Sequence, residues 1–372
     1  MTQPYIHLLT KNDYVLFKNN EVIIETKDYH RDNVFNLVYE EDWTIVILEM
    51  DYFDCEKVIN FLINKKVKKV AFIINDVFRI KHKIKFIPPL DSSFIEKDLS
   101  NISFSEIQII KKIIKKSNIL EYKIFHCEKM PKYLQDFVKL EVNYYDLFLY
   151  QWISYQRRTL NIKHHNNFTY KVSSFNKRYE EYRILLTALL HENKDFYYTL
   201  CQLDLKQNLF KNFNNFDNKF KTFITEKCNS LYQTPLKQIK ENRDLDLYLY
   251  NTIQNSFLHL VNETRFYSPM QNLSEKSIRP IISKRPFVLA AAPRSLRLLK
   301  SLGFKTFDQW WDESYDDEPD HHKRLIMVYR LIDQFLNKDH QELKQVLEDQ
   351  KSVLDYNYEV YLNFRAKIYQ TI

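Results

Sequence analysis

The chain of 372 residues contains a single glycine, Gly303, and this scarcity limits how it can bind a ligand. Average glycine usage of about 7% would give roughly twenty-six glycines. Walker-type and G-x-G-x-x-G loops need several glycines, because backbone amides must approach a phosphate closely. The sequence therefore excludes both kinds of phosphate-binding loop. Any phosphate must instead be held by side chains, helix amino ends and the amides of other residues.

Length and composition predict a folded protein of roughly two or three domains, because 45% of its residues are hydrophobic and can fill several cores. The four cysteines form no C-x-x-C pair, which favours a reducing compartment over a disulfide framework or a zinc ribbon. The sequence begins without a signal-peptide pattern, and no run of about eighteen apolar residues occurs. We therefore expect a cytoplasmic protein without a membrane span. Its oligomeric state stays open.

The first half of the chain is predicted to contain a parallel sheet. A short β-branched run at 43–50 indicates a buried strand, 55–64 has the apolar spacing of a helix, and 70–74 indicates a second buried strand. Strand, helix and strand within about thirty residues form a βαβ unit, which makes the two strands parallel. An amphipathic helix is predicted from 103 onward, with isoleucines inward and lysines outward.

A third strand, predicted at 79–87, carries a row of cations. The alternation of a strand places four basic side chains on one face: Arg79, Lys81, Lys83 and Lys85. Between residues 65 and 123 the chain has fourteen Lys and Arg against six Asp and Glu, so this half is predicted to carry a positive surface suited to an anionic partner. Two interpretations stay open, an acceptor-binding surface and an edge strand whose lysines prevent aggregation.

The second half repeats the alternation of strands and helices. The predicted strands are 168–174, 257–261 and 286–292, and the predicted helices are 180–191, 244–254, 274–282, 295–302, 323–336 and 341 onward. Gly303 follows the helix 295–302 at the position where a left-handed residue commonly ends a helix. This alternation predicts a second α/β domain.

Three polar clusters stand at strand-to-helix junctions, where open α/β sheets bind ligands. Their members are Asn176, Lys177, Arg178 and Arg183; Asn262, Glu263 and Thr264; and Ser274, Glu275, Lys276 and Arg279. Cations can bind a diphosphate by charge-assisted hydrogen bonds, a carboxylate can accept two ribose hydroxyls, and a helix amino end attracts phosphate. Each cluster alone also has a structural interpretation, because Ser274 and Glu275 can cap a helix and the arginines can be ordinary surface residues.

The order of the segments SSFNKRYEEYR, HLVNET and LSEKSIRPIISKRPFVLAAAPRSLRLLKSLGFKTFDQWWDESYD resembles a family of phage, viral and bacterial glycosyltransferases related to the α-1,3-fucosyltransferases. The resemblance covers about 168–330 and is most specific over 263–316. Ser274, Asn262 and Arg279 stand where the family commonly has Thr, Thr and Lys, and Ala291-Ala292 replaces a usual glycine. A second FITEK segment at 223–227 is out of order and is interpreted as a decoy.

The resemblance implies a GT-B arrangement, an α/β fold in which two Rossmann-like domains face each other across a cleft. We predict an acceptor-side α/β domain at 1–158, a nucleotide-sugar-binding domain at 159–336, and C-terminal helices at 337–372 whose packing on the first domain is left open. The implied donor contacts are Asn176, Arg178 and Arg183 on the diphosphate, Glu275 on the ribose, Lys276 on the phosphate or the departing charge, and Glu263 near the sugar. The acidic segment 312–316 matches the family and, because it precedes a predicted helix, is expected to stabilise the amino end of that helix.

The predicted reaction moves a hexosyl or pentosyl group from a nucleotide-sugar to an acceptor hydroxyl, with inversion implied by the resemblance alone. Because protein cations would stabilise the leaving diphosphate, the sequence predicts neither a metal nor another cofactor. A general base would take the proton of the acceptor hydroxyl. The candidates are the carboxylates Glu49, Asp51 and Asp76 near the ends of first-domain strands, with His82 as an outsider, and each also has a structural interpretation.

The acceptor stays open at this stage. The basic first half and the phage-like composition favour DNA carrying modified bases, and a surface or virion glycan is the alternative. A non-catalytic nucleic-acid-binding or structural protein is the rival from another class. It would use the lysine strand and the many aromatic side chains as a charged stacking surface, but it does not explain the ordered motifs.

Overall fold

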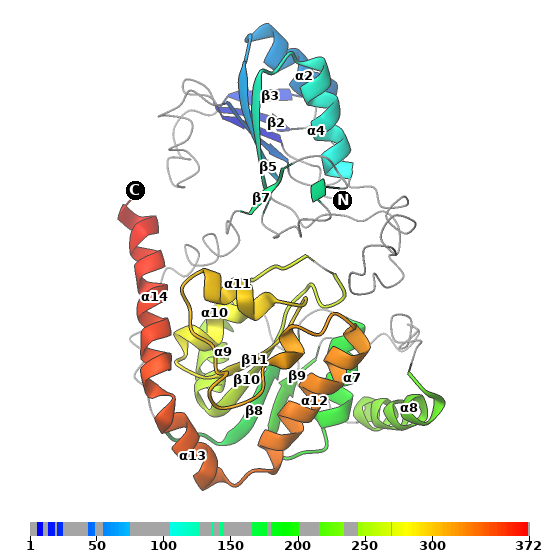
Figure 1. Cartoon of the computed structure of the whole chain (residues 1–372), viewed down its shortest axis with the longest axis vertical. Helices are drawn as coiled ribbons and strands as arrows, with labels where there is room; N and C mark the ends of the chain where they lie inside the picture. The colour runs from blue at the N-terminus through cyan, green and yellow to red at the C-terminus, as the bar shows by residue number, and fades with distance from the viewer. Residues whose placement is uncertain are drawn as a thin grey trace. The chain divides into compact units, whose positions relative to one another are not determined.

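The chain divides into two compact units, one of Met1–Ser154 with Phe364–Ile372 and one of Tyr155–Asn363. Figure 1 shows its computed structural model. The structure describes residues 6–9, 14–18, 21–24, 44–48, 55–74, 105–126, 135–136, 141–144, 166–176, 180–200, 216–233, 245–268 and 270–370. Each unit has a sheet with parallel strands and helices, which confirms the predicted α/β class. The domain boundaries and the arrangement across a cleft stay predictions.

The first unit contains a seven-stranded sheet in the order β3-β2-β1-β4-β5-β6-β7. Its strands are β1 (Ile6–Leu9), β2 (Tyr14–Lys18), β3 (Glu21–Ile24), β4 (Thr44–Leu48), β5 (Lys69–Ile74), β6 (Glu121–His126) and β7 (Asn143–Tyr144). Strands β4 to β7 run parallel, whereas β1 pairs antiparallel with both β2 and β4. The predicted βαβ unit is confirmed, because helix α2 (Cys55–Asn64) connects the parallel strands β4 and β5.

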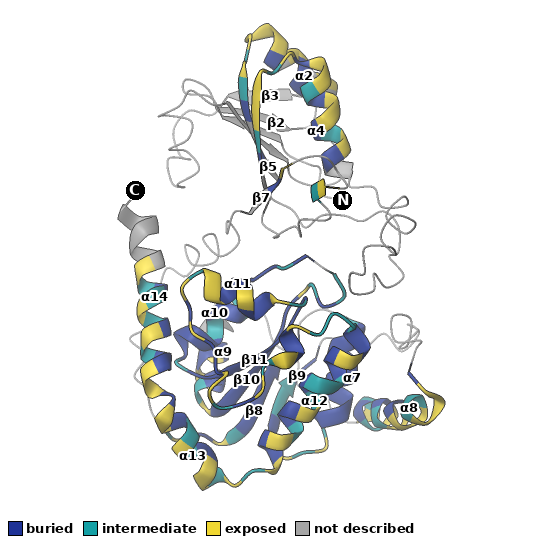
Figure 2. Cartoon of the chain, in the orientation of Figure 1, coloured by how far each residue is buried: buried dark blue, intermediate teal, exposed yellow. Residues whose placement is uncertain are grey.

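Two amphipathic helices, α2 and α4 (Ser105–Lys116), pack against each other in the first unit. Val58 and Leu62 of α2 and Ile110 and Ile113 of α4 are fully buried, whereas the lysines of α4 stay at the surface (Figure 2). This is the segregation expected of a helix with one apolar face. The cationic strand predicted at 79–87 lies outside the described residues.

The second unit contains a four-stranded, all-parallel sheet in the order β11-β10-β8-β9 (Figure 1). Its strands are β8 (Tyr170–Phe175), β9 (Phe196–Thr199), β10 (Ser256–Asn262) and β11 (Phe287–Ala290). Every residue of β10 and β11 is buried. Helices pack against both strands, so these strands are continuous buried runs, as in other parallel sheets that are covered on both faces.

Helices follow and cover these strands. They are α7 (Glu181–Leu190), α8 (Asn218–Gln233), α9 (Leu245–Gln254), α10 (Glu275–Ile282), α11 (Ser295–Ser301), α12 (His321–Asn337), α13 (His340–Asp349) and α14 (Lys351–Gln370), with a 3-10 turn, η1 (Ser314–Asp316). Helix α7 is buried at every position, and α12 packs against α7 and β8. Gly303 has a φ of +94° just beyond the end of α11, which confirms the predicted left-handed helix stop.

The strand order reverses between β8 and β10. From β8 the chain continues through α7 to β9 on one side, and it later returns to β10 and β11 on the other side. The loops that leave the carboxyl ends of β8 and β10 therefore turn away from each other. In open α/β sheets a ligand commonly binds in the crevice that this divergence creates. The first two predicted polar clusters follow these two strand ends.

Helix α8 was not predicted, because its sequence is polar and rich in asparagine and lysine. Its buried residues are Ile224, Cys228 and Leu231, and their spacing of four and three positions is the one helical signal in this segment. The decoy segment 223–227 lies within this helix. Among the described residues, no helix is long and apolar enough to cross a membrane.

Candidate functional site

Polar side chains join the carboxyl ends of β8 and β10. Asn262, the last residue of β10, donates from Nδ2 to Ser174 Oγ at 2.9 Å and to Asn176 Oδ1 at 3.0 Å. Asn176 in turn donates to Thr187 Oγ1 of α7 at 3.5 Å. Both asparagines are buried. The first and second predicted clusters therefore meet at the point where the strand order reverses.

Glu263 connects β10 to the amino end of α10. Its Oε1 accepts hydrogen bonds from Ser274 N at 2.9 Å and Ser277 Oγ at 2.7 Å, and its Oε2 accepts from Ser274 Oγ at 2.6 Å. The residue is fully buried. A carboxylate beside a helix amino end is stabilised by the amides there and by the helix dipole. In this geometry the carboxylate holds α10 in place and does not face solvent.

Two cations follow Glu263 on the first turns of α10. Lys276 Nζ lies 3.1 Å from Glu275 Oε1, 3.1 Å from Ser274 Oγ and 3.9 Å from Glu263 Oε2, and its side chain is 23% exposed. Arg279, one turn further, has a buried Nε without a hydrogen-bond partner among the described residues. These groups add positive charge to the helix amino end, where an anion is already favoured.

Glu275 is ionised beside these cations. Burial raises the pKa of its carboxyl group, but Lys276 and Arg279 lower it by more, so the net pKa is below its ordinary value. An ionised carboxylate has only acceptor sites, so it suits a ligand that presents hydroxyl groups. The third cluster therefore holds two cations and one hydroxyl acceptor.

Arg183 belongs to the same group of contacts. It is buried on α7, and its Nε donates to Tyr182 Oη at 3.2 Å, while the Tyr182 hydroxyl donates to the backbone carbonyl of Glu263. Burial lowers the pKa of Arg183, whereas Tyr182, Glu180 and Glu263 together raise it by more. The guanidinium is therefore a permanent buried cation next to the end of β10.

A neutral histidine lies beneath Arg279. His259 of β10 is hydrogen bonded through Nδ1 to Ser173 Oγ of β8 at 2.9 Å. Burial, assisted by the charge of Arg279, lowers the pKa of His259 to about 3. The imidazole therefore carries no charge near neutral pH. It supports the sheet beneath the cations without adding to them.

Among the remaining predicted residues, the structure describes only Thr264. Thr264 is exposed. Lys177 and Arg178 lie outside the described residues. So do the general-base candidates Glu49, Asp51 and Asp76, and the residues of the predicted acceptor surface, Arg79, Lys81, Lys83 and Lys85. Their roles stay predictions.

The sequence reasoning missed Ser277 and Tyr182, which contact Glu263. Ser277 carried a usable signal, because it stands three positions after the capping residue Ser274 and so lies on the same side of the helix. Tyr182 carried none. Its contact with the Glu263 carbonyl spans 81 positions and depends on how α7 packs against β10.

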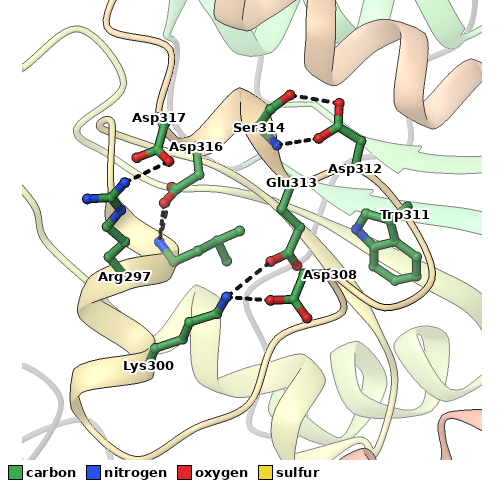
Figure 3. Close-up of a pocket in the computed structure, with 10 residues that line it drawn as sticks. Arg297, Lys300, Asp308, Trp311, Asp312, Glu313, Ser314, Asp316 and Asp317 are labelled. Atoms are coloured by element: carbon green, nitrogen blue, oxygen red, sulfur yellow. Dashed lines mark hydrogen bonds and ion pairs between the residues drawn. The ribbon is translucent and has the colours of Figure 1, made fainter.

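A separate hollow of about 300 Å³ lies beside α11 and the acidic segment 312–316. Figure 3 shows both of its cations paired with carboxylates. Arg297 pairs with Asp317 at 2.9 Å, and Lys300 pairs with Asp308 at 2.7 Å. Five carboxylates and two cations line the hollow, so it would repel a diphosphate. We therefore place the candidate site at α10 and not in this hollow.

Asp316, in the acidic segment 312–316, stabilises the fold through hydrogen bonds to a helix amino end. Both of its carboxylate oxygens accept from Leu296 N at 3.0 Å, at the amino end of α11. Burial raises the pKa of Asp316 to about 7, against the lowering effect of the amides of Leu296 and Arg297. The sequence predicted that these acids stabilise the amino end of the helix that follows them, whereas Asp316 stabilises the amino end of another helix. The helix is α11, which precedes the segment in the chain.

Comparisons with known proteins identify similar structures but no related sequence. No protein-family model and no curated protein matches the chain. The structure is similar to that of T4 phage BGT, which was solved in complex with UDP and Mn²⁺. The two sequences are 10% identical, the match covers 88% of this chain and 82% of that chain, and the TM-score is 0.36. The structure is also similar to that of the pneumococcal O-GlcNAc transferase GtfA, solved in complex with UDP and GlcNAc, with 8% identity, 96% and 68% covered, and a TM-score of 0.34.

The comparison with T4 phage BGT corrects one prediction. The sequence analysis expected no metal, but that protein was solved with Mn²⁺ beside UDP. The expectation that no metal takes part is therefore withdrawn. Among the described residues, no group of three or more His, Cys, Asp or Glu side chains could hold a metal ion.

Proposed function

We propose that the chain is a glycosyltransferase whose nucleotide-sugar donor binds at the amino end of α10, between the carboxyl ends of β8 and β10. One observation carries the proposal. Three polar clusters, the first of them about eighty positions before the other two, are joined by hydrogen bonds and ion pairs at the reversal of strand order. This is where an α/β sheet commonly binds a nucleotide. The motif resemblance concerns these same clusters.

The charges of this group suit a diphosphate. Lys276 and Arg279 stand on the first turns of α10, and Arg183 adds a buried cation close to Glu263. In the transfer step, the acceptor oxygen forms a bond to the sugar carbon and loses its proton to a general base. The bond between that carbon and the donor phosphate oxygen breaks, and negative charge develops on the departing diphosphate. Cations held in place before the reaction stabilise that charge without reorganising. This arrangement replaces the glycine-rich loop that the sequence lacks.

The individual donor contacts follow from exposure. Lys276 is partly exposed and can reach a phosphate, and the ionised Glu275 beside it can accept the two ribose hydroxyls. The carboxylate of Glu263 is buried against Ser274 and Ser277, so we assign it the support of α10. Asn176 is a member of the same hydrogen-bonded group, and Lys177 and Arg178 follow it in the chain.

The acceptor side of the proposal is less specific. We propose a hydroxyl acceptor on a modified DNA base, with a surface or virion glycan as the alternative, and a phage origin for the enzyme. The excess of Lys and Arg over 65–123 supports a polyanionic acceptor. Such an acceptor would bind less tightly as the salt concentration rises, because bound counterions are released, whereas a neutral glycan would show little dependence on salt.

A thermal-shift screen tests the donor site. UDP-, GDP- and CMP-sugars are added separately to the wild-type protein and to the variants Lys276→Ala and Lys300→Ala. A ligand at 100 times its Kd stabilises the folded protein by about 2.7 kcal/mol, which is a shift of several degrees in Tm. We expect one nucleotide class to raise the Tm of the wild type and of Lys300→Ala but not of Lys276→Ala.

The control variant Lys300→Ala is matched to the test variant. Lys300 is also a lysine on the helix after a strand of the same sheet, and it is also paired with carboxylates. It lies on α11 beside the acidic hollow, outside the proposed donor site. If no nucleotide-sugar stabilises the wild type, or if both lysine variants respond alike, the proposed donor site is wrong.

A further inference from the structure

A column of three buried side chains stands beneath the end of β10. The guanidinium of Arg324, in the first turn of α12, lies 4.6 Å from the ring centroid of Phe266. The ring of Phe266 stacks on that of Tyr182, with centroids 4.3 Å apart and 9° between the planes. Tyr182 and Phe266 are fully buried, and Arg324 is 2% exposed. We call these three residues the positioning column.

Arg324 connects the loops at the carboxyl end of the sheet. It donates from Nε to Ala291 O, after β11, at 3.1 Å, and from Nη2 to Phe266 O, after β10. Its Nη1 donates to the carbonyls of Glu318 and Pro319 at 2.5 and 3.2 Å. Only a planar guanidinium presents donors in several fixed directions, so a lysine could not make all of these bonds.

Tyr182 transfers this constraint to the candidate site. Its hydroxyl donates to the carbonyl of Glu263, and its backbone N donates to Tyr267 Oη at 2.8 Å. The carboxylate of the same Glu263 accepts from Ser274 and Ser277 at the amino end of α10. A continuous path of contacts therefore runs from α12 through the positioning column to α10.

We propose that Tyr182, Phe266 and Arg324 are positioning residues that hold Glu263, and through it the amino end of α10, in the geometry that the donor diphosphate requires. This inference rests on the proposed function for its consequence in binding, although the structural link can be measured without a ligand. A glycine-rich loop would present amides to phosphate from its own backbone. This site presents side chains, which must be oriented closely to bind well, so a rigid support beneath them is needed.

Amide hydrogen exchange on the full chain tests the link. The variant Tyr182→Phe removes one hydroxyl and keeps the ring stack. The matched control is Tyr315→Phe, which removes another buried hydroxyl of the same unit, one that accepts from Leu289 N at 3.2 Å and does not touch Glu263. Exchange at the Ser274 amide, which donates to Glu263, is measured relative to the amides of the central strand β10.

We expect Tyr182→Phe to speed exchange at Ser274 about fivefold relative to β10, the change that corresponds to the loss of one hydrogen bond. Tyr315→Phe should leave this ratio unchanged. The variant Arg324→Lys should act in the same direction as Tyr182→Phe. If Tyr182→Phe and Tyr315→Phe change the ratio equally, Tyr182 does not position α10 and the proposal is overturned.

Nucleotide binding separates this inference from the proposed function. With UDP, GDP and CDP as probes in titration calorimetry, Tyr182→Phe should weaken the nucleotide that binds the wild type about tenfold, and Tyr315→Phe should not. If exchange at Ser274 responds but no nucleotide binds the wild type, the positioning column stands and the proposed function fails. If the wild type binds and Tyr182→Phe binds equally well, the proposed function stands and the positioning role in binding fails.

Discussion

The amino ends of α10 and α11 follow neighbouring parallel strands of one sheet, yet the charged side chains around them differ. At α10, Glu263 is engaged with two serines, and Lys276 and Arg279 add positive charge beside it. At α11, both carboxylate oxygens of Asp316 accept a hydrogen bond from the backbone amide of Leu296. A strand end followed by a helix is therefore not sufficient to make an anion site. The side chains around the helix end decide whether an anion can enter.

The pKa shifts of Glu275, at the amino end of α10, and of Asp316, at the amino end of α11, reflect this difference. Lys276 and Arg279 overcome burial and lower the pKa of Glu275, whereas burial raises the pKa of Asp316 to about 7. Asp317 and Glu313 add to that increase, because like charges disfavour ionisation. One helix end therefore keeps its carboxylate charged and cation-paired, and the other favours the protonated form.

The largest effect that distinguishes the two ends is expected from Glu263→Ala. This change leaves Ser274 and Ser277 without their buried acceptor and leaves Lys276 with one ion-pair partner fewer, so we expect about 3–5 kcal/mol of lost stability. The matched change at the other helix, Asp316→Ala, should cost about 0.5–2 kcal/mol, as for other helix caps. Urea unfolding measures both. Equal losses would mean that the two ends are held in the same way.

The secondary structure was largely predictable from local sequence. Strands such as 256–262 and 287–290 are largely apolar runs of the right length, and Gly303 marks a helix end. Helix α8 escaped prediction because its mean hydropathy is low and only three of its residues are buried, so its periodic signal is weak. The general rule that ligands bind at strand ends located the three clusters, since it depends only on the order of strands and helices.

The supporting contacts of the site were not predictable. The stack of Tyr182 on Phe266 and the bonds of Arg324 join segments whose separation is fixed only by tertiary packing. No local propensity specifies such pairs. The buried surroundings of Glu263 were not predictable for the same reason, and its place near the sugar stays a prediction. Its burial follows from serines that the helix α10 brings to it.

The next largest effect concerns pH and Asp316. The folded-state pKa of about 7 lies above the ordinary value of 3.8, so the folded protein binds this proton more tightly than the unfolded chain. Stability from this group should therefore fall as pH rises from about 4 to about 7, by at most about 4 kcal/mol. The Glu275 carboxyl has a lowered pKa, so its contribution is present above its ordinary value of 4.5 and is lost at lower pH.

Thermal unfolding of the wild type and of Asp316→Asn between pH 4 and pH 8 checks this expectation. Asparagine keeps an oxygen acceptor but cannot ionise, so the variant should gain stability relative to the wild type as the pH rises. Asp308→Asn is the control, because Asp308 is 54% exposed and pairs with Lys300 in the same hollow. Parallel stability curves for the wild type and Asp316→Asn would show that Asp316 does not titrate in this range.

A smaller effect is expected from the two arginines of these helices. Arg279 has a buried Nε at the cationic end of α10, and Arg297 is 64% exposed on α11, where it pairs with Asp317. We expect Arg279→Gln to weaken binding of the stabilising nucleotide about tenfold, the loss of one charge-assisted hydrogen bond. Arg297→Gln should leave the affinity unchanged. Titration calorimetry measures both, and a similar affinity loss in the two variants would place the charge requirement outside α10.

The smallest effect tests whether Ser274 only caps the amino end of α10 or also contributes to nucleotide binding. Ser274 accepts from Lys276 N at 3.4 Å and donates to Glu263 Oε2, so Ser274→Ala should cost about 1 kcal/mol in urea unfolding, whereas Ser274→Thr should keep most of it. If capping is its only role, nucleotide affinity should follow the small change in stability. If the serine also orients Lys276, whose Nζ lies 3.1 Å from Ser274 Oγ, affinity should fall in Ser274→Ala and recover in Ser274→Thr. If the alanine variant binds the nucleotide with unchanged affinity, Ser274 does not contribute to binding, and only the cations of this helix end do.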